Sequence, residues 1–418
     1  MNILFISETF PDAAHPAQGT YNEALCRALA VRHRVRVVSP RPWIEALPHR
    51  LRGRRYETPE KVRASGIEAL YPTHYYLPRV REWNYGQRMW QSVRRSVARH
   101  AAEGAFDAVL SYWAHPDGEA GLMAAQSLGI PSAVIVGGSD VLMLPKRKNR
   151  GACVTRVLTE SSAVFTVSEG LRQAVIGLGI DPAKVHTTYQ GVDGEVFCSG
   201  DQSEARKRVG LRETGARRLV WVGRMVPVKR VDLLIEAAHL LWQEGLRFSL
   251  HLVGDGPLRR QLQTRVSDLG LRECVFFEGA VSHARLPDWY RAADLVVLSS
   301  ASEGLPNVLR EAAACGTPFV STDIGSIREI ADPGFSRLVP PGSAPHLAKG
   351  IREALAPELR DAAQRYWPRS WANCARDIEE HFERLIGKRG TSDPSPKDGP
   401  EDTGSSGELA LEHADIIR

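Results

Sequence analysis

Short runs of β-branched and aliphatic residues alternate with longer stretches of helical periodicity along most of the chain. The runs expected to form strands are 3–7, 35–39, 108–112, 133–136 and 164–168 in the first half, and 218–222, 248–253, 275–278, 295–299 and 319–322 in the second. Helices such as 231–242 and 306–314 are expected to follow them. Strands that alternate with helices are typical of parallel sheets covered on both faces. The pattern therefore predicts an α/β protein with two doubly wound, Rossmann-like domains.

The rhythm of strands is interrupted between 191 and 215, where turn-forming and charged residues gather. We expect an N-terminal domain over 1–198 and a C-terminal domain over 199–387, whose last helix is a candidate to cross back onto the first domain. Residues 388–418 are rich in Gly, Ser, Asp, Pro and Glu, and the stretch 391–418 holds two Lys/Arg against seven Asp/Glu. This composition predicts a disordered acidic tail.

Composition narrows the class of protein. The chain has 418 residues, of which 43% are hydrophobic and 25% charged, as in ordinary globular proteins. No stretch reaches the roughly 18 apolar residues of a membrane span, and the start does not resemble a secretory signal, so we expect a cytoplasmic protein. The six cysteines stand singly, without the spacing of a metal site or a disulfide framework, so no metal is expected.

Basic residues are concentrated near the N-terminus, where residues 1–100 hold 17 Lys/Arg against eight Asp/Glu, with a cluster at 49–63. The segment 79–99 holds six arginines, and Trp83, Met89, Trp90, Val93 and Val97 recur in it at near-helical spacing. Such a face can lie on an anionic leaflet, at the inner side of the plasma membrane. Alternatively, it packs its apolar side inward. Nucleic acid is not expected as a partner, because the aromatic-interleaved modules that read RNA are absent.

Candidate chemistry follows the ends of the strands in the second half. Glu303 and Glu311 stand eight residues apart around an expected helix start, where free backbone amides can hold a phosphate. Arg224 and Lys229 follow the strand at 218–222 and can offer cations to a diphosphate. A loop at 254–257 also follows a strand. Because ligands bind at the carboxyl ends of parallel strands, we expect these groups to face a cleft between the two domains.

Together these motifs resemble those of the retaining glycosyltransferases of family 4, which have the GT-B fold. The resemblance covers residues 1–386 and depends most on a Glu-x7-Glu motif at 303–311. Supporting stretches lie at 168–172, 191–193, 223–229, 252–258, 292–294 and 312–318.

The resemblance implies a role for each matching position of the C-terminal domain. Arg224 and Lys229 would bind the diphosphate of a nucleotide-sugar donor, linked to UDP or GDP, and stabilise its charge as it leaves. Glu303 would meet the donor sugar, and Glu311 the ribose. No cofactor other than this donor substrate is implied. The remaining donor-binding positions would be Gly223, Gly254, Gly279, Ala280, Val281, Gly304, Leu305, Asn307 and Val308.

In the N-terminal domain Gly19 would let the backbone approach the donor. His115 and Asp140 lie in loops that would face the sugar and are candidate catalytic residues; for Asp140 capping of a turn is the alternative. The sequence departs from the family pattern twice. Tyr112 occupies the position where a histidine is common, and Gln190 precedes a Gly-Val-Asp turn where asparagine is common.

The expected function is transfer of a hexosyl group, with retention of configuration, from the donor to a lipid-linked or cell-envelope glycan acceptor held by the N-terminal domain. Two alternatives stay open. Because a fold does not fix a reaction, the chain could be an epimerase or a phosphorylase of the same fold. It could also be a degenerate relative that acts as a binding or scaffold subunit, a possibility raised by Tyr112.

Overall fold

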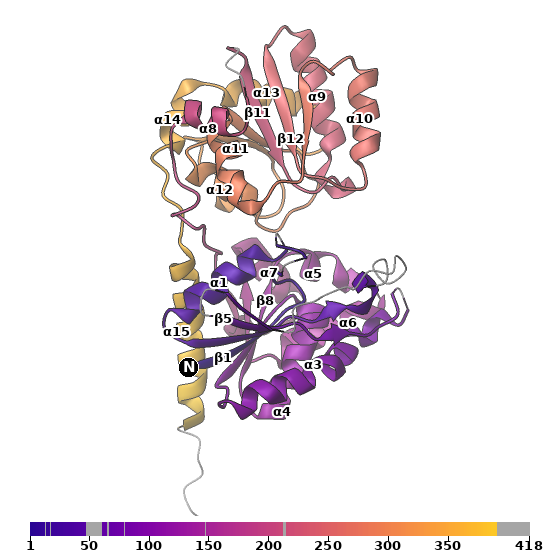
Figure 1. Cartoon of the computed structure of the whole chain (residues 1–418), viewed down its shortest axis with the longest axis vertical. Helices are drawn as coiled ribbons and strands as arrows, with labels where there is room; N and C mark the ends of the chain where they lie inside the picture. The colour runs from indigo at the N-terminus through magenta and orange to yellow at the C-terminus, as the bar shows by residue number, and fades with distance from the viewer. Residues whose placement is uncertain are drawn as a thin grey trace, which may run out of the picture.

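The computed structural model describes residues 1–12, 14–16, 18–46, 61–64, 67–78, 80–146, 148–211 and 215–390. The basic cluster expected at 49–63 and the tail expected at 388–418 fall mostly outside these residues. Figure 1 shows two α/β domains stacked along the long axis of the molecule, the N-terminal domain below the C-terminal one. The prediction of a two-domain, Rossmann-like GT-B architecture is confirmed by this arrangement of sheets.

The N-terminal domain is built on a sheet that, within the described residues, has eight strands in the order β10-β9-β8-β7-β1-β2-β5-β4. All neighbours are parallel except β4 and β5. A separate pair, β3 with β6, lies beside it. The strands are β1 (Asn2–Ile6), β2 (Arg34–Val38), β3 (Arg41–Pro42), β4 (Lys61–Ala64), β5 (Ile67–Leu70), β6 (Thr73–His74), β7 (Ala108–Tyr112), β8 (Ser132–Val136), β9 (Ala163–Thr166) and β10 (Val185–Thr187).

The second sheet, in the part of the chain that the structure describes, has six parallel strands in the order β13-β12-β11-β14-β15-β16. Counted within this domain the order is 3-2-1-4-5-6, which is that of the dinucleotide-binding Rossmann fold. The strands are β11 (Arg217–Val222), β12 (Phe248–Val253), β13 (Val275–Gly279), β14 (Leu295–Leu298), β15 (Phe319–Thr322) and β16 (Ser336–Val339).

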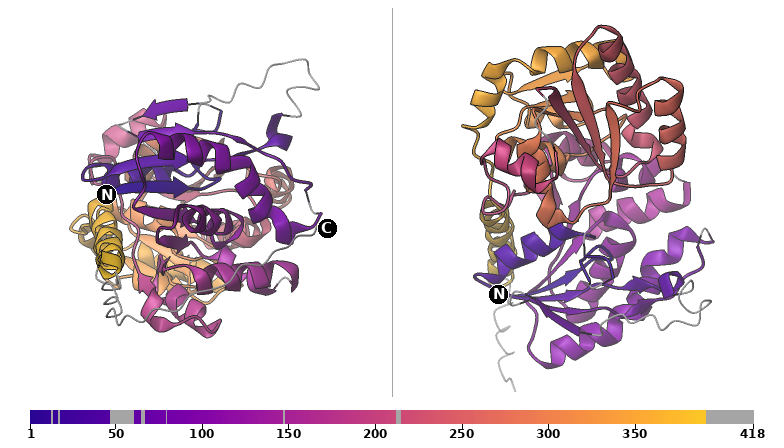
Figure 2. Two further views of the ribbon diagram at one scale, coloured as in Figure 1. Left: turned by 90° about the horizontal axis from the view of Figure 1, so that it is seen from below. Right: turned by 45° about the horizontal axis from the view of Figure 1, so that its top comes forward.

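Helices cover both faces of each sheet (Figures 1 and 2). Those of the N-terminal domain are α1 (Thr20–Ala30), α3 (Tyr85–Ala102), α4 (Glu119–Leu128), α5 (Ser139–Leu142), α6 (Lys148–Glu160) and α7 (Glu169–Gly177). Those that follow are α8 (Gln202–Arg208), α9 (Val231–Gln243), α10 (Arg259–Asp268), α11 (Leu286–Ala292), α12 (Asn307–Ala314), α13 (Ala344–Ala354), α14 (Pro357–Ala363) and α15 (Trp371–Gly390). Short 3-10 or irregular turns include η3 (Ala114–Gly118), η6 (Pro227–Lys229) and η8 (Ile327–Glu329).

Alternate residues of β1 explain why the strands read as nearly continuous hydrophobic runs. Ile3 and Phe5 pack in a cluster that includes residues of α1 and α15, whereas Leu4 and Ile6 pack in a second cluster with residues of α3 and α4. Successive side chains of a strand point to opposite faces, so a strand buried on both sides needs apolar residues throughout. The same division separates the two clusters that flank β11.

The apolar stripe predicted within 79–99 belongs to α3 and faces inward. Met89, Val93 and Val97 are at most 2% exposed and pack against β1 and α4. Arg94, Arg95 and Arg99 lie on the exposed side of the helix. The inward-packing alternative is therefore the correct one for these apolar residues, and this stripe is not available to a membrane.

The last helix, α15, leaves the C-terminal domain and runs along the N-terminal one (Figure 1). Cys374, Ala375, Ile378 and Phe382 are buried in the core cluster of the first sheet. The helix continues to Gly390, so residues 388–390, which we expected in the tail, belong to it. The chain thus crosses between the domains twice, once before α8 and once before α15.

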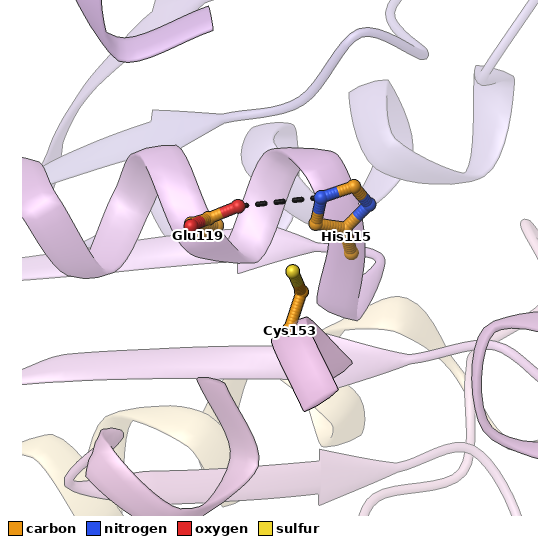
Figure 3. A group of neighbouring side chains, drawn as sticks. All are labelled: His115, Glu119 and Cys153. Atoms are coloured by element: carbon orange, nitrogen blue, oxygen red, sulfur yellow. Dashed lines mark ion pairs between the residues drawn. The ribbon is translucent and has the colours of Figure 1, made fainter. Parts of the chain in front are cut away.

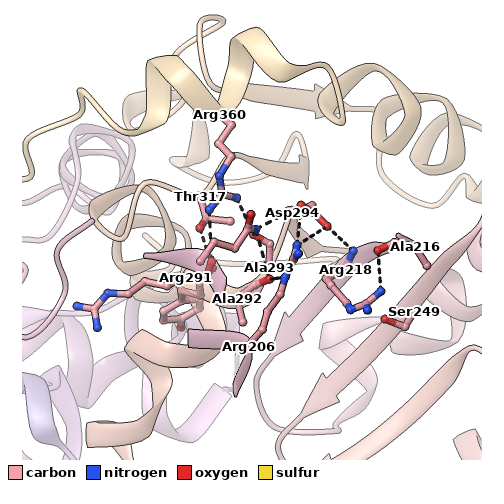
Figure 4. Close-up of polar contacts among 12 residues, drawn as sticks. Arg206, Ala216, Arg218, Ser249, Arg291, Ala292, Ala293, Asp294, Thr317 and Arg360 are labelled. Atoms are coloured by element: carbon pink, nitrogen blue, oxygen red, sulfur yellow. Dashed lines mark hydrogen bonds and ion pairs between the residues drawn. The ribbon is translucent and has the colours of Figure 1, made fainter. Parts of the chain in front are cut away.

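Asp294 fixes the start of β14 at the edge of the sheet that lies away from the first domain (Figure 4). Its carboxylate accepts hydrogen bonds from the backbone amide of Arg218 at 2.6 Å and from Arg206 of α8 at 3.1 Å. Arg360 of α14 donates to the carbonyl oxygen of Ala293 at 2.7 Å. These contacts connect the amino ends of β11 and β14 to α8 and α14. The candidate site lies at the other, carboxyl ends of the same two strands.

Replacing Ile378 with alanine should lower the free energy of unfolding by about 2 to 5 kcal/mol, because the side chain is fully buried between α15 and the first sheet. Glu380→Ala, on the exposed side of the same helix, is the control and should change it by less than about 0.5 kcal/mol. Chemical denaturation measures both. Equal, small effects would contradict the packing of α15 on the N-terminal domain.

Candidate functional site

The site lies where the strand order of the second sheet reverses. β11 and β14 are neighbours in the sheet, with Val220 opposite Val296, yet the chain moves outward in opposite directions from them. The loops that follow these two strands leave a crevice at the carboxyl edge of the sheet, which is where open α/β sheets bind ligands. Lys229 belongs to the first loop and Glu303 to the second.

Lys229 and Glu303 form an ion pair across this crevice. The Lys229 Nζ lies 2.5 Å from Oε1 of Glu303, and the Ser300 hydroxyl donates to the same oxygen at 2.6 Å. The Lys229 side chain is 23% exposed and that of Glu303 12%. The carbonyl oxygen of Lys229 accepts from the Ser299 hydroxyl, which ties the first loop to the end of β14. The two residues are thus held together and remain accessible to a ligand.

Arg224 lies in the loop between β11 and η6 and is exposed. Its backbone carbonyl accepts from the amide of Val226, which curls the loop. The structure does not bring its guanidinium into the pair formed by Lys229 and Glu303. The two predicted cations therefore differ, because one is already paired and the other extends into solvent.

Three of the predicted glycines lie side by side at the ends of neighbouring strands. Gly223 follows β11, Gly254 follows β12 with φ of 137°, and Gly279 ends β13 with φ of 79°. The amide of Gly254 donates to the carbonyl oxygen of Gly279 at 2.7 Å, and a Cβ added to Gly254 would lie 1.8 Å from the Gly223 oxygen. The backbones here approach too closely for any side chain. Ala280 and Val281 continue from this edge.

Glu311 lies on one side of α12, which begins at Asn307 and not at Pro306 as the sequence suggested. Its carboxylate accepts from the Tyr290 hydroxyl at 2.9 Å and lies 3.3 Å from Nε2 of His283. The hydrogen bond and the negative charge of Glu311 raise the pKa of His283 above its ordinary value. Glu311 thus has protein partners on both carboxylate oxygens, and His283 is a neighbour that sequence reasoning missed.

A cavity of about 370 Å³ separates the two domains at this level. The C-terminal domain contributes both members of the ion pair and the stretch that opens α12, and the N-terminal domain contributes aromatic residues. The cavity is lined by Tyr21, Tyr112, Trp113, Gly137, Val167, Gln190, Lys229, Glu303, Leu305, Pro306, Asn307 and Val308. Of the candidate site residues, the structure thus brings Lys229, Glu303, Leu305, Asn307 and Val308 to one cavity wall.

Gly304 lies at the point where the two domains touch. A Cβ added to it would lie 2.4 Å from the carbonyl oxygen of Gly137, and one added to Gly138 would lie 3.2 Å from the Gly304 Cα. Leu305 is 8% exposed and belongs to the core cluster of the first domain, although its chain segment belongs to the second. This stretch therefore joins the domains as well as lining the cavity.

Asp140 has no exposed surface and its carboxylate is occupied by the backbone. It accepts from the amides of Gly138 at 2.8 Å, Ala114 at 3.1 Å and Gly137 at 3.2 Å. Burial raises the pKa of Asp140 to about 6, against the effect of these amides. The geometry favours the capping alternative, in which Asp140 fixes two cleft loops relative to each other.

His115 is not among the residues that line the cavity; its ring lies beside Glu119 and Cys153 (Figure 3). Its ring is buried between η3, α4 and α6, where Arg150 donates to Nδ1 at 3.1 Å and Nε2 lies 3.3 Å from Glu119. Arg150 can only donate, so Nδ1 accepts and Nε2 carries the hydrogen that faces Glu119. The expectation that His115 faces the sugar is not met, because the loop turns this side chain into the domain.

The group of His115, Glu119 and Cys153 has its potential ligand atoms within 4.8 Å of one another. It does not fit a cation. The hydrogen on Nε2 leaves this nitrogen without a free lone pair, and the guanidinium of Arg156 pairs with Glu119. A second guanidinium, that of Arg150, lies beside the ring. These contacts describe a polar network in which Glu119 is ion-paired with the partly exposed Arg156.

Tyr112, unlike His115, lines the cavity. The Tyr112 hydroxyl accepts a hydrogen bond from Gln190 at 2.8 Å, and Arg310 of α12 donates to the backbone oxygen of Gln190. Sequence reasoning noted Tyr112 and Gln190 only as departures from a pattern and missed Arg310. The sequence did offer a signal for Arg310, because an arginine within the Glu-x7-Glu motif falls on the side of the helix that is buried.

Gly19 precedes α1 in a left-handed conformation with φ of 71°, and a Cβ there would lie 2.3 Å from the carbonyl oxygen of Thr9. The loop after β1 folds back on itself at this point, so the need for glycine arises within the loop. The loop also carries Thr9, to whose carbonyl oxygen Asn22 of α1 donates at 2.6 Å.

Two facing Rossmann-like domains with a cavity between their carboxyl edges are the arrangement of the GT-B fold. Family models match both halves: residues 18–196 match "Glycosyltransferase Family 4" and residues 201–368 match "Glycosyl transferases group 1". The chain belongs to the family 4 type of glycosyltransferases.

Among curated relatives, a putative teichuronic acid biosynthesis glycosyltransferase, TuaC of Bacillus subtilis, is 29% identical over 367 residues, covering 84% of this chain and 88% of its own. D-inositol 3-phosphate glycosyltransferase 1 of Catenulispora acidiphila is 33% identical over 286 residues, covering 63% of this chain and 67% of its own.

Solved structures share the fold. Anabaena Alr3699/HepE in complex with UDP and glucose superposes with a TM-score of 0.70 at 20% identity, covering 92% of this chain and 100% of its own. Sucrose-phosphate synthase from Thermosynechococcus elongatus superposes with a TM-score of 0.72 at 19% identity, covering 93% of this chain and 97% of its own.

Across the described residues, no helix has the length and apolar character needed to span a membrane.

Replacing Glu311 with glutamine should lower the pKa of His283, because the variant lacks the charge and the strong acceptor that favour the imidazolium. In the parent chain the protonated histidine stabilises the fold fully below its unfolded-state pKa of about 6.5. That stabilisation is lost as the pH rises through the raised pKa. NMR titration of the ring measures both pKa values. An unchanged pKa would show that His283 and Glu311 do not interact.

Proposed function

We propose that this protein transfers a hexosyl group from a nucleotide-diphosphate sugar, linked to UDP or GDP, to a lipid-linked or cell-envelope glycan acceptor, with retention of configuration. The observation that carries the proposal is the cavity between the domains, lined by Lys229 and Glu303 at the switch point of the second sheet. Its volume of about 370 Å³ lies in the range of small-molecule sites. Retention is inferred from the resemblance to the family.

The ion pair suits a charged donor. The ammonium of Lys229 can attract a diphosphate, and the carboxylate of Glu303 is an acceptor for sugar hydroxyls next to it. Arg224 extends from the adjacent loop into solvent, and we propose that it closes on the diphosphate when the donor binds. Negative charge that develops on the leaving diphosphate would then be stabilised by two cations, which is electrostatic catalysis.

The backbone at the start of α12 supplies the remaining donors. Asn307 and Val308 open the helix, so their amides lack partners within it, and the amides of Gly304 and Leu305 lie in the loop just before it. We propose that these amides bind donor oxygens, while Glu311, approached past His283, meets the ribose. Gly223, Gly254 and Gly279 would leave room for the nucleotide at the strand ends, beside Ala280 and Val281.

The acceptor would enter from the N-terminal domain. TuaC is described as a putative enzyme of teichuronic acid biosynthesis, a relative that supports a cell-envelope glycan as the acceptor class. The neighbours that bind UDP and glucose support a nucleotide-sugar donor.

We propose that the exposed part of the predicted segment 79–99, together with the residues just before it, makes peripheral contact with an anionic membrane at the inner face of the plasma membrane. Four large apolar residues of the loop before α3 are between 44% and 62% exposed: Tyr75, Leu77, Val80 and Trp83. Arginines of α3 and Arg81 are exposed in the same region of the chain. Apolar side chains beside basic ones are the combination that binds anionic interfaces.

Thermal unfolding with UDP, GDP, ADP and their sugar conjugates tests the donor site. A ligand at ten times its dissociation constant stabilises by about 1.4 kcal/mol, which raises the midpoint by a few degrees at most. We expect one nucleotide to do so, and the Arg224→Ala, Lys229→Ala double variant to lose the effect. If no nucleotide shifts the midpoint, the site is not a transferase site and the scaffold alternative gains support.

Cosedimentation with vesicles that contain anionic lipid tests the membrane surface. We expect salt-sensitive binding by the chain, and loss of binding when Leu77, Val80 and Trp83 are all replaced with serine, because this removes the exposed apolar area. Trp367→Ser is the matched control, since Trp367 is 84% exposed on the other domain. No salt-sensitive binding by the parent chain, or equal loss in the control, would contradict the proposal.

A further inference from the structure

Three buried side chains from the two domains form a hydrogen-bonded series that ends at the cavity. Arg310 of α12 donates to the backbone oxygen of Gln190 and, through Nη2, to its Oε1 at 3.4 Å. Nε2 of Gln190 donates to the Tyr112 hydroxyl at 2.8 Å. All three residues are at most 6% exposed.

The direction of this series follows from the chemistry of arginine. A guanidinium has only donors, so the amide atom that faces Arg310 must be the oxygen of Gln190. The amide nitrogen then faces Tyr112 and donates to its oxygen. Since the Gln190 amide approaches with a hydrogen, the hydrogen of the Tyr112 hydroxyl has to point elsewhere.

The cavity is the space to which this hydrogen can point. Tyr112 and Gln190 both line the 370 Å³ cavity, and among the described residues Gln190 is the one that hydrogen-bonds the Tyr112 hydroxyl. A Cβ added to Gly137 would lie 3.0 Å from this hydroxyl, so the glycine keeps the approach open. A smaller cavity of about 10 Å³ behind the ring, lined in part by Thr188, has room for one water molecule at most.

We propose that Arg310 and Gln190 are positioning residues that direct the hydroxyl hydrogen of Tyr112 into the cavity, where it donates a hydrogen bond to a sugar oxygen of the donor. This inference rests on the proposed function. Negative charge of the donor would be met on the opposite wall by Lys229, whereas Tyr112 is a neutral donor suited to an uncharged oxygen. Arg310 stands on α12, so the helix that opens the donor site also orients the group facing it.

Isothermal titration with UDP, UDP-glucose, GDP and GDP-mannose tests the proposal, since each pair isolates the contribution of the sugar. For the pair that binds, Tyr112→Phe should reduce the affinity for the nucleotide sugar about five- to tenfold and leave that for the nucleotide unchanged, as expected for one lost hydrogen bond. The midpoint of unfolding without ligand confirms that the variant is folded.

Gln190→Glu tests the direction of the series. An ionised carboxylate only accepts, so it would pair with Arg310 and take the hydrogen of Tyr112 away from the cavity. We expect the same five- to tenfold loss for the nucleotide sugar alone. A role in packing alone would not produce this result, because the side chain keeps its size and its partner Arg310.

Tyr21→Phe is the matched comparison. Tyr21 lines the same wall, but its hydroxyl donates to Oγ1 of Thr9 at 3.4 Å. An equal loss of affinity for the nucleotide sugar in Tyr21→Phe would overturn the inference. So would an unchanged affinity for the nucleotide sugar in Tyr112→Phe or Gln190→Glu while the nucleotide still binds. An unchanged affinity would mean that the hydroxyl hydrogen of Tyr112 points to water in the smaller cavity. No binding of any nucleotide or nucleotide sugar by the parent chain would contradict the proposed function, and the inference with it.

Discussion

The backbones of the two domains touch at Gly138 and Gly304, and the rest of the site depends on this contact. Any Cβ at Gly304 would meet the carbonyl oxygen of Gly137 at 2.4 Å, so the loops after β8 and β14 can approach only as glycines. The contact brings the carboxyl edges of both sheets to opposite walls of one cavity. Each wall supplies a different chemistry, because charged residues lie on the C-terminal side and aromatic residues on the N-terminal side.

Several further contacts between the domains are polar, which suits surfaces that separate and rejoin. Glu329 of η8 accepts from the amides of Glu169 and Gly170 at the start of α7, both at 2.8 Å, and from the Tyr189 hydroxyl. Arg310 reaches Gln190 from α12. By contrast, α15 is held by apolar packing on the first domain. The domains are thus connected by the apolar packing of α15 and of Leu305, and by hydrogen bonds that domain closure can rearrange.

The sequence was enough to predict most of the central strands, because strands buried on both faces are apolar at every position. The edge strands β4, β10 and β16 were missed, and so was β5 next to β4, since short strands at or near an edge lack this continuous pattern. Lys229 and Glu303 could be placed together, because both follow neighbouring strands. The orientation of His115 could not be predicted, since it depends on how the turn before α4 packs the side chain between α4 and α6. Tyr112 and Gln190 stood out separately, and only the fold shows that they are hydrogen-bonded to each other.

Deuterium exchange of backbone amides with UDP-glucose or GDP-mannose tests the central claim, that loops of both domains form a single donor site. The account predicts that whichever donor binds will slow exchange at once in the loops after β11 and β14 and in those after β7 and β8. Protection confined to one domain, or absent with both donors, would contradict it.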